Sequence, residues 1–297
     1  MGSSLGRQAS GWLLAIALAP ATALAGDWHS LDSLVCSDCH TMHNSSGGQP
    51  MRYDSAATPA PALLRHASSL ALCVYCHDGS NPGAPDVIAP VSYVSDPAAG
   101  FFANVGGVAS PNAHDLALAT AVVPPGGSLA VILTCTTCHA PHGTASYRNL
   151  AADPSGQGGA ASPVSARQTV LPTGTNPAQV YVGGNVVHKG GMSKWCGRCH
   201  GDYHGRTSGQ EGTQSPWLRH PQEQTISTST HVDFTYWLGP QTNRVVVQSP
   251  TDDLVPSADD QVFCLSCHKA HGSPNRAALV FADGSRQSST CDQCHNP

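Results

Sequence analysis

Charged and aromatic side chains are both scarce in this sequence. Only 11% of its 297 residues are charged and only 6% are aromatic. A typical globular chain is about 25% charged, so the surface is unusually poor in charge. With so few aromatic rings, we do not expect a core filled by aromatic side chains in a chain of this length. No stretch carries a long basic run, which argues against nucleic acid as a partner.

Long apolar segments are also missing, except near the N-terminus. Residues 12–25 are apolar and rich in alanine, Arg7 is the only charge ahead of them, and the Ala-Leu-Ala at 23–25 has the form that precedes signal-peptide cleavage. A membrane span needs about 20 apolar residues, and Pro20 interrupts this stretch. We therefore expect a cleaved signal peptide over 1–25, no membrane span, and export to the periplasm or the cell exterior.

Cysteine and histidine, in contrast, are abundant, with 12 and 16 copies. Twelve cysteines in an exported chain first suggest a disulfide framework. Their spacing argues against it, because they fall into six C-x-x-C pairs with none left over, and each pair is followed at once by histidine. Numbered in chain order, these motifs 1 to 6 are Cys36-Ser-Asp-Cys39-His40, Cys73-Val-Tyr-Cys76-His77, Cys135-Thr-Thr-Cys138-His139, Cys196-Gly-Arg-Cys199-His200, Cys264-Leu-Ser-Cys267-His268 and Cys291-Asp-Gln-Cys294-His295.

The chemistry of haem attachment explains this pattern. Two thiols on one helical turn can add to the two vinyl groups of a haem, and the next residue, histidine, can then bind the iron. A zinc ribbon would use two cysteine pairs per site without needing each histidine, and a thioredoxin-like motif would occur once. The sequence therefore predicts six covalently bound haem c groups, with all twelve cysteines as thioethers and the six adjacent histidines as proximal iron ligands.

Six irons need a second axial ligand, and ten histidines remain to supply it. After the signal peptide the chain has only three methionines, the other common axial ligand, so we expect bis-histidine haems of low potential. Our candidates for the distal ligands are His43, His114, His142, His188, His220 and His271.

These six candidates are chosen by their positions relative to the motifs. His43, His142 and His271 each follow a proximal histidine by three residues and cannot fold back onto the same iron, so we expect them to reach a neighbouring haem. His114 and His220 precede motifs 3 and 5 and are expected to serve the haem of their own unit. His188 is expected to arch over the haem of motif 4.

The other histidines are weaker candidates for iron binding. His204 follows His200 by four residues, and His29 and His66 each lie seven residues before a motif. For every one of the ten, the alternative is a surface histidine or a partner of a haem propionate. Six sites for ten residues would leave four such spares.

The motifs divide the chain into two halves. We expect an N-terminal three-haem region at 26–150, a linker or wrapping loop rich in Gly, Pro and Ala at 151–184, and a C-terminal three-haem region at 185–297. Six haems would form most of the core of so short a chain. The predicted fold class is mostly irregular, with short α-helices and few short strands, wrapped around a row of haems. A helix is expected over 63–77, and short strands at 181–182 and 245–247.

Several segments resemble the doubled CXXCH family of multihaem cytochromes c. The resemblance extends over most of 27–297 and is carried by the Cys-x-x-Cys-His-x-x-His-Gly units at 135–143 and 264–272, and by residues 36–43, 147–150 and 217–221. It implies an exported electron carrier, like relatives in metal-reducing bacteria whose bis-histidine haems are packed in chains, some of them in extracellular filaments. It supports the same distal ligands, although His204 departs from the family spacing by one residue.

The sequence therefore predicts electron transfer rather than enzymatic catalysis. The expected partners are other redox proteins or cytochromes, metal ions or oxides, and the chain itself in a head-to-tail filament, in which a spare histidine or a terminal haem could ligate across subunits. The formal charge is −5, or −6 without Arg7, and haem propionates would make it more acidic, which favours basic or cationic partners. The alternative is a multihaem reductase of nitrite, hydroxylamine or a sulfur oxyanion, which needs an open iron position that six regular motifs do not suggest.

Overall fold

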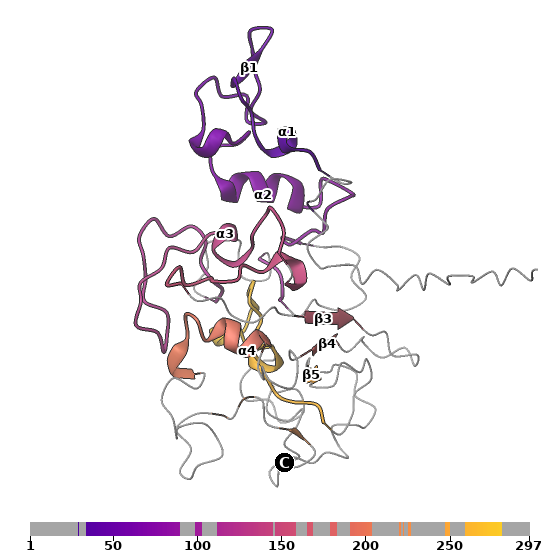
Figure 1. Cartoon of the computed structure of the whole chain (residues 1–297), viewed down its shortest axis with the longest axis vertical. Helices are drawn as coiled ribbons and strands as arrows, with labels where there is room; N and C mark the ends of the chain where they lie inside the picture. Colours follow the sequence, from indigo (N-terminus) through magenta and orange to yellow (C-terminus); the bar gives the residue numbers. More distant parts are fainter. Residues whose placement is uncertain are drawn as a thin grey trace, which may run out of the picture.

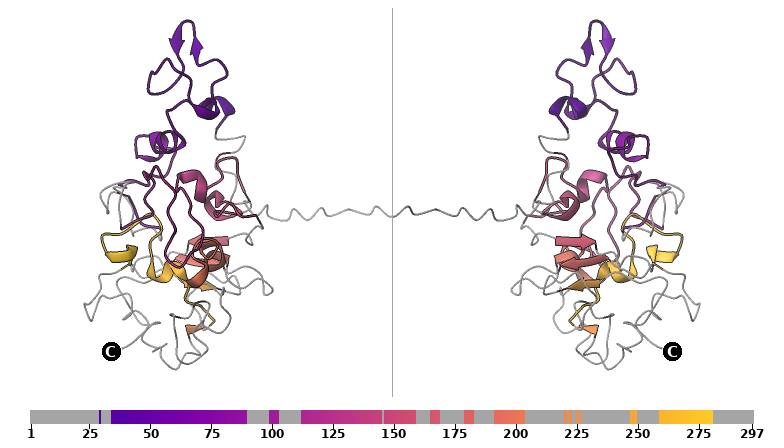
Figure 2. Two further views of the ribbon diagram at one scale, coloured as in Figure 1. Left: turned by 90° about the vertical axis from the view of Figure 1, so that its left-hand side faces the viewer. Right: turned by 90° about the vertical axis from the view of Figure 1, so that its right-hand side faces the viewer.

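The computed structural model describes a molecule that is extended along one axis. Helices α1, α2, α3 and α4 follow one another along this axis (Figure 1), and the two side views show the same order (Figure 2). The segment of the C-terminal motif 5 lies beside α4, far from α1. The structure describes His29, 34–89, 99–102, 112–144, 146–158, 165–168, 179–182, 191–203, His220, Gln222, 225–226, 247–249 and 259–280.

Helices in the described residues are short and coincide with the motifs. They are α1 (Cys36–Cys39), α2 (Ser69–His77), α3 (Cys135–Cys138), α4 (Gly191–Cys196) and α6 (Cys264–Cys267). In α1, α3 and α6 the residue before the second cysteine caps the turn, since its side chain accepts the backbone N–H of the residue before the first cysteine. The capping side chains are Asp38, Thr137 and Ser266, at 2.8, 3.0 and 3.2 Å.

The described strands are few, as predicted. Strand β1 (Ser45–Ser46) pairs with β2 (Gln49–Pro50) in an antiparallel hairpin. Strands β3 (Ser165–Gln168), β4 (Gln179–Val182) and β5 (Val247–Ser249) form a second sheet, in which β4 is antiparallel to β3 and parallel to β5. The expected strand at 181–182 lies in β4, and that at 245–247 meets β5 only at Val247. The second sheet ties the expected linker to the C-terminal region.

The predicted helix over 63–77 begins later than expected, at Ser69. The Ser68 hydroxyl caps it by accepting the Ala71 N–H at 3.1 Å. Before it, Ala62 and Leu63 adopt positive φ angles of 53° and 56°, which no right-handed helix contains. The prediction began too early because apolar residues recur at helical spacing across this turn as well as in the helix.

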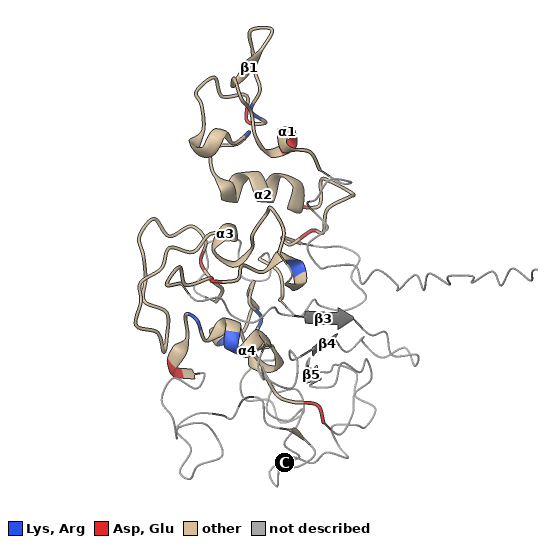
Figure 3. Ribbon diagram, in the orientation of Figure 1, with Lys and Arg blue, Asp and Glu red and all other residues tan. Residues whose placement is uncertain are grey.

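Side chains build only a small core in the described residues. Leu150, Met192, Phe263 and Leu265 form a buried cluster, and Trp195 packs against it while donating its indole N–H to the Ala151 carbonyl at 2.6 Å. Charged residues are scattered singly along the described ribbon (Figure 3). None of the described helices has the length and apolar character needed to cross a bilayer. The fold is therefore mostly irregular chain held around its motifs.

Candidate functional site

The proximal histidines of motifs 1 to 5 share one hydrogen bond. In each, the ring Nδ1 lies within hydrogen-bonding distance of a backbone carbonyl, and a carbonyl can only accept, so Nδ1 carries the proton. Nε2 is then the nitrogen left to bind a metal. The pairs are His40 with Ala62 (3.0 Å), His77 with Pro85 (2.8 Å), His139 with Arg148 (2.8 Å), His200 with Pro125 (2.7 Å) and His268 with Ala277 (2.9 Å).

Four of these rings face a second imidazole. A metal binds imidazole nitrogen at about 2.0–2.1 Å, so two imidazoles on opposite sides of one metal have centroids about 6 Å apart. The observed separations of the ring centroids agree with this value. The facing pairs are His40 with His142 (6.2 Å), His77 with His29 (6.0 Å), His139 with His271 (6.3 Å) and His200 with His114 (6.0 Å).

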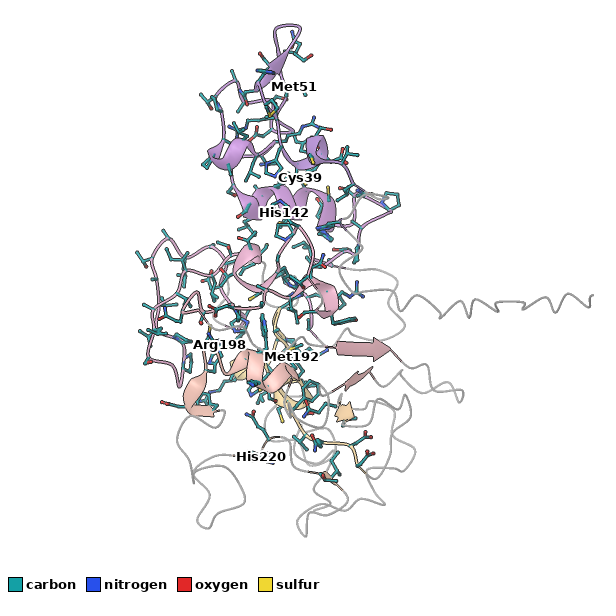
Figure 4. The ribbon with its side chains drawn as sticks, in the orientation of Figure 1. Cys39, Met51, His142, Met192, Arg198 and His220 are labelled. Atoms are coloured by element: carbon teal, nitrogen blue, oxygen red, sulfur yellow. The ribbon has the colours of Figure 1, made fainter. Side chains whose placement is uncertain are left out.

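Two of the four partners come from the loops where the sequence analysis placed them. His142 follows motif 3 but lies at motif 1, near Cys39 (Figure 4), and His271 follows motif 5 but lies at motif 3. Each thus meets the motif two before its own in the chain, rather than the adjacent one that the sequence analysis expected. His114 differs from the expectation, because it lies beside His200 of motif 4 and not beside motif 3. The chain from His114 to motif 3 runs out through a hairpin that reaches motif 4.

His29, one of the weaker candidates, is brought to motif 2. Its ring faces His77 and bonds the carbonyl of Pro141, the residue next to His142. His66, which shares the same spacing before a motif, instead lies 3.6 Å from the Asp54 carboxylate. The sequence offered no signal that separates the two, because both precede a motif by the same number of residues.

The distal imidazoles are also held by backbone carbonyls. His114 donates to Ala270 at 2.9 Å, and His271 bonds the Gly100 carbonyl. Burial is the main cause that lowers the pKa of His114 and lowers that of His271 to about 4. The neutral imidazole is the form that binds metals, so both rings are suited to ligation at neutral pH.

Two of the remaining candidates, His43 and His220, lie within the described residues. His43 is exposed and has no ring contact within the described residues. His220 is exposed and lies in the lower part of the molecule (Figure 4). His188, His204 and all of motif 6, with Cys291, Cys294 and His295, lie outside the described residues.

The thiols of successive motifs lie close together in chain order. The motif 1 thiol Cys39 has its pKa raised by burial and, next, by nearby Cys76 of motif 2. A hydrogen bond to Cys135 of motif 3 raises the pKa of Cys73 of motif 2. Motifs 1, 2 and 3 are therefore neighbours in that order.

The same order continues into the second half of the chain. Burial raises the pKa of Cys138 to about 12, and Cys199 of motif 4 adds to this effect. A hydrogen bond to Cys264 of motif 5, together with burial, raises the pKa of Cys196. The ten described cysteines form no disulfides with one another. The first five motifs therefore form a row along the long axis of the molecule.

Comparison with known proteins agrees with this donor set. Residues 255–297 match the family described as the doubled CXXCH motif. The chain is 25% identical to the C-type cytochrome OmcS of Geobacter sulfurreducens, over 87% of this chain and 81% of that protein. The chain is therefore similar to a c-type cytochrome over most of its length.

Solved structures show the same fold. The outer membrane cytochrome S filament from Geobacter sulfurreducens superposes with a TM-score of 0.54 at 20% identity, covering 84% of each chain. The OmcS nanowires of the same organism give a TM-score of 0.52 at 21% identity, with the same coverage. Three features of this chain suit covalently bound haem c. They are the paired thiols, the proximal histidines anchored at Nδ1, and the facing imidazoles.

Proposed function

We propose that this protein transfers electrons along a row of six bis-histidine haems outside the cytoplasm. The observation that carries the proposal is the set of four facing imidazole pairs, whose motifs touch in chain order through their thiols. Each bound haem supplies a one-electron iron couple. The chain supplies the spacing, the axial nitrogens and the burial that tune it.

The histidines divide the work between them. His40, His77, His139 and His200 supply proximal nitrogens, and the second nitrogens come from His142, His29, His271 and His114 in that order. Both axial positions of these four haems are then filled by the chain, which favours electron transfer over the reductase alternative, since a reductase needs an open iron position. The distal roles expected for His188 and His220 stay predictions.

Optical spectra and a redox titration of the purified, haem-loaded protein test this proposal. We expect low-spin bis-histidine spectra, a haem-to-protein ratio of six, and midpoint potentials spread over a low range. A large high-spin fraction that binds nitrite or cyanide readily would contradict electron transfer and favour the reductase.

We further propose that the chain assembles head to tail into a filament. Three units carry a second histidine three residues after the first, at motifs 1, 3 and 5. In two of them this second histidine faces the preceding odd motif: His142 lies at motif 1 and His271 at motif 3. Continued by one step, the same rule takes His43 of one copy to motif 5 of the copy before it.

Exposure and position support this contact between copies. Strand β1, which follows His43, lies near one end of the long axis (Figure 1), while α6, which ends just before His268, packs beside α4. Both histidines are exposed. A contact between two different surfaces that does not close produces a fibre. The solved relatives form a filament and nanowires, which adds support from similarity.

Electron microscopy of the native secreted protein tests the filament. Filaments with a repeat close to one molecule are expected, whereas only monodisperse particles would reject it. The acidic charge of the chain with its propionates favours basic redox proteins, metal ions or metal oxides as further partners, docked at exposed haem edges.

A further inference from the structure

Three left-handed turns recur at the same place relative to motifs 1, 3 and 5. Each contains two consecutive non-glycine residues with φ between 53° and 56°, a region that side chains disfavour. Strained backbone persists only where surrounding structure holds it, and it gathers at functional sites. The three pairs are Ala62-Leu63, Arg148-Asn149 and Ala277-Ala278.

The first residue of each turn holds the proximal histidine. Its carbonyl accepts the Nδ1 proton of His40, His139 or His268, at 3.0, 2.8 and 2.9 Å. In its left-handed conformation this residue aims its carbonyl at the ring, and the following residues return along the motif. The hydrogen bond fixes the orientation of the ring and increases the basicity of Nε2.

The second residue of each turn holds the segment between the two histidines of the unit. Its carbonyl accepts the N–H of the residue after the proximal histidine, which is Thr41, Ala140 or Lys269, at 2.8, 2.7 and 2.8 Å. Just beyond the turn, a backbone N–H returns to the carbonyl of the second cysteine, at 2.9, 2.8 and 2.9 Å. The second histidine of the unit lies two residues after the anchored Thr41, Ala140 or Lys269.

Motifs 2 and 4 provide an internal comparison. Neither has a second histidine at the three-residue spacing. In the described residues around them, positive φ occurs at single glycines, such as Gly126 beside Pro125, and not at two consecutive non-glycine residues. The proximal histidines of these two motifs bond the carbonyls of Pro85 and Pro125. The turn therefore accompanies the doubled units and not haem attachment in general.

We propose that each left-handed turn is a positioning element that sets two axial histidines at once, the proximal ligand of its own haem and the distal ligand of another haem. The turn at 277–278 would hold His268 at motif 5 and His271 at motif 3. This inference rests on the proposed haem ligation. It makes a prediction that a merely structural turn would not make, namely that one backbone change alters two haems.

Ala277→Pro in the full-length, haem-loaded protein tests the turn. Proline fixes φ near −65° and cannot adopt the left-handed angle, so the Ala277 carbonyl leaves His268. We expect the low-spin electron paramagnetic resonance signals of two haems to change and their midpoint potentials to shift to more positive values, because the imidazoles lose basicity. Ala277→Gly is the matched control, since glycine adopts positive φ freely and should leave both readouts unchanged.

Ala277→Val gives a second measurement should the proline variant fail to load haem. Its β-branched side chain resists positive φ, so both signals should shift partway. A change in one haem only, or equal changes in the glycine and valine variants, would overturn the proposal. Wild-type protein without low-spin bis-histidine signals would instead overturn the proposed function, so the two failures are distinguishable.

Discussion

At the scale of single residues, the sites depend on which of several equivalent histidines reaches an iron. His29 and His66 share one spacing to the following motif, yet only His29 faces a proximal histidine. Tertiary contacts decide which of the two histidines reaches a proximal histidine. For His29 the contact is with the Pro141 carbonyl, which belongs to a segment far along the chain. Local spacing therefore predicts the proximal ligands and leaves the distal ligands open.

His29→Ala is expected to open one haem. With the imidazole gone, the haem of motif 2 loses its sixth ligand, so a high-spin species that binds carbon monoxide should appear with the intensity of one haem. His66→Ala is the matched control and should leave the low-spin spectrum unchanged. Optical titration with carbon monoxide distinguishes the two, and equal binding by both variants would contradict the assignment of His29.

Asp153 is expected to stabilise the fold near motif 4 in a pH-dependent way. The Ser155 hydroxyl, at 2.6 Å, and Arg198, at 3.1 Å, hold its pKa at about 2. Because the pKa is lower in the folded than in the unfolded chain, this stability is present above about pH 4 and is lost as the pH falls towards 2.

Asp153→Asn should therefore cost about 1 kcal/mol of unfolding free energy at pH 7, with solvent screening taken into account. The difference from wild type should shrink below pH 4. Urea unfolding of the haem-loaded protein at both pH values measures it. Asp115→Asn is the control, since among the described residues that carboxylate accepts one backbone N–H, from Ala117. A cost for Asp153→Asn that does not change with pH would count against the charged interaction.

At the scale of elements, the sequence predicted the type of structure better than its boundaries. In motifs 1, 3 and 5 the two cysteines begin and end a helical turn of their own, because the third residue of the motif caps that turn. The helix predicted over 63–77 began too early, since no propensity reveals that Ala62 and Leu63 adopt left-handed angles. The sequence also could not predict which backbone carbonyl accepts the Nδ1 proton of each histidine, because every residue carries a carbonyl.

The loop at 124–127 illustrates an element that serves one motif. Pro125 accepts the Nδ1 proton of His200, and a Cβ atom on Gly127 would lie 2.3 Å from the Cys199 carbonyl oxygen. Gly127→Ala must therefore push this loop away from motif 4. We expect a loss of about 1–3 kcal/mol in stability and a changed low-spin signal from one haem.

Thermal unfolding and electron paramagnetic resonance measure the two effects. Gly83→Ala is the matched control, because the nearest atom to its Cβ would be Asn81 Oδ1 at 3.4 Å. If the Gly127→Ala protein has the unfolding temperature and the paramagnetic resonance spectrum of wild type, close packing of this loop on motif 4 is excluded.

At the scale of the whole molecule, the order of motifs 1 to 5 in the chain is also their order in space. The sequence predicted a row of haems from the short chain length per haem, and the thiol contacts of motifs 1 to 5 follow that row. It could not predict that distal ligands skip one motif, since that depends on how the units stack. The division into regions at 150 and 185 stays a prediction.

His43→Ala is expected to abolish filaments while leaving a folded, haem-loaded monomer. The exposed His43 would no longer fill the site at motif 5 of the next copy, so the contact loses its strongest bond. Electron microscopy and sedimentation measure the assembly. Met42→Ala is a closely matched control, since Met42 is the adjacent residue and is 80% exposed. Filaments of normal length from His43→Ala would exclude this ligation.

The long-range pairing of histidines also has a consequence for biosynthesis. In the proposed ligation, His142 completes motif 1 and His271 completes motif 3, so an early site waits for a segment that crosses the membrane later. A chain exported from its N-terminus must hold partly ligated haems until that segment arrives. Truncation after motif 4 would leave the iron of motif 3 with an open position, and a cell could recognise such unfinished chains by their reactivity rather than by exposed apolar surface.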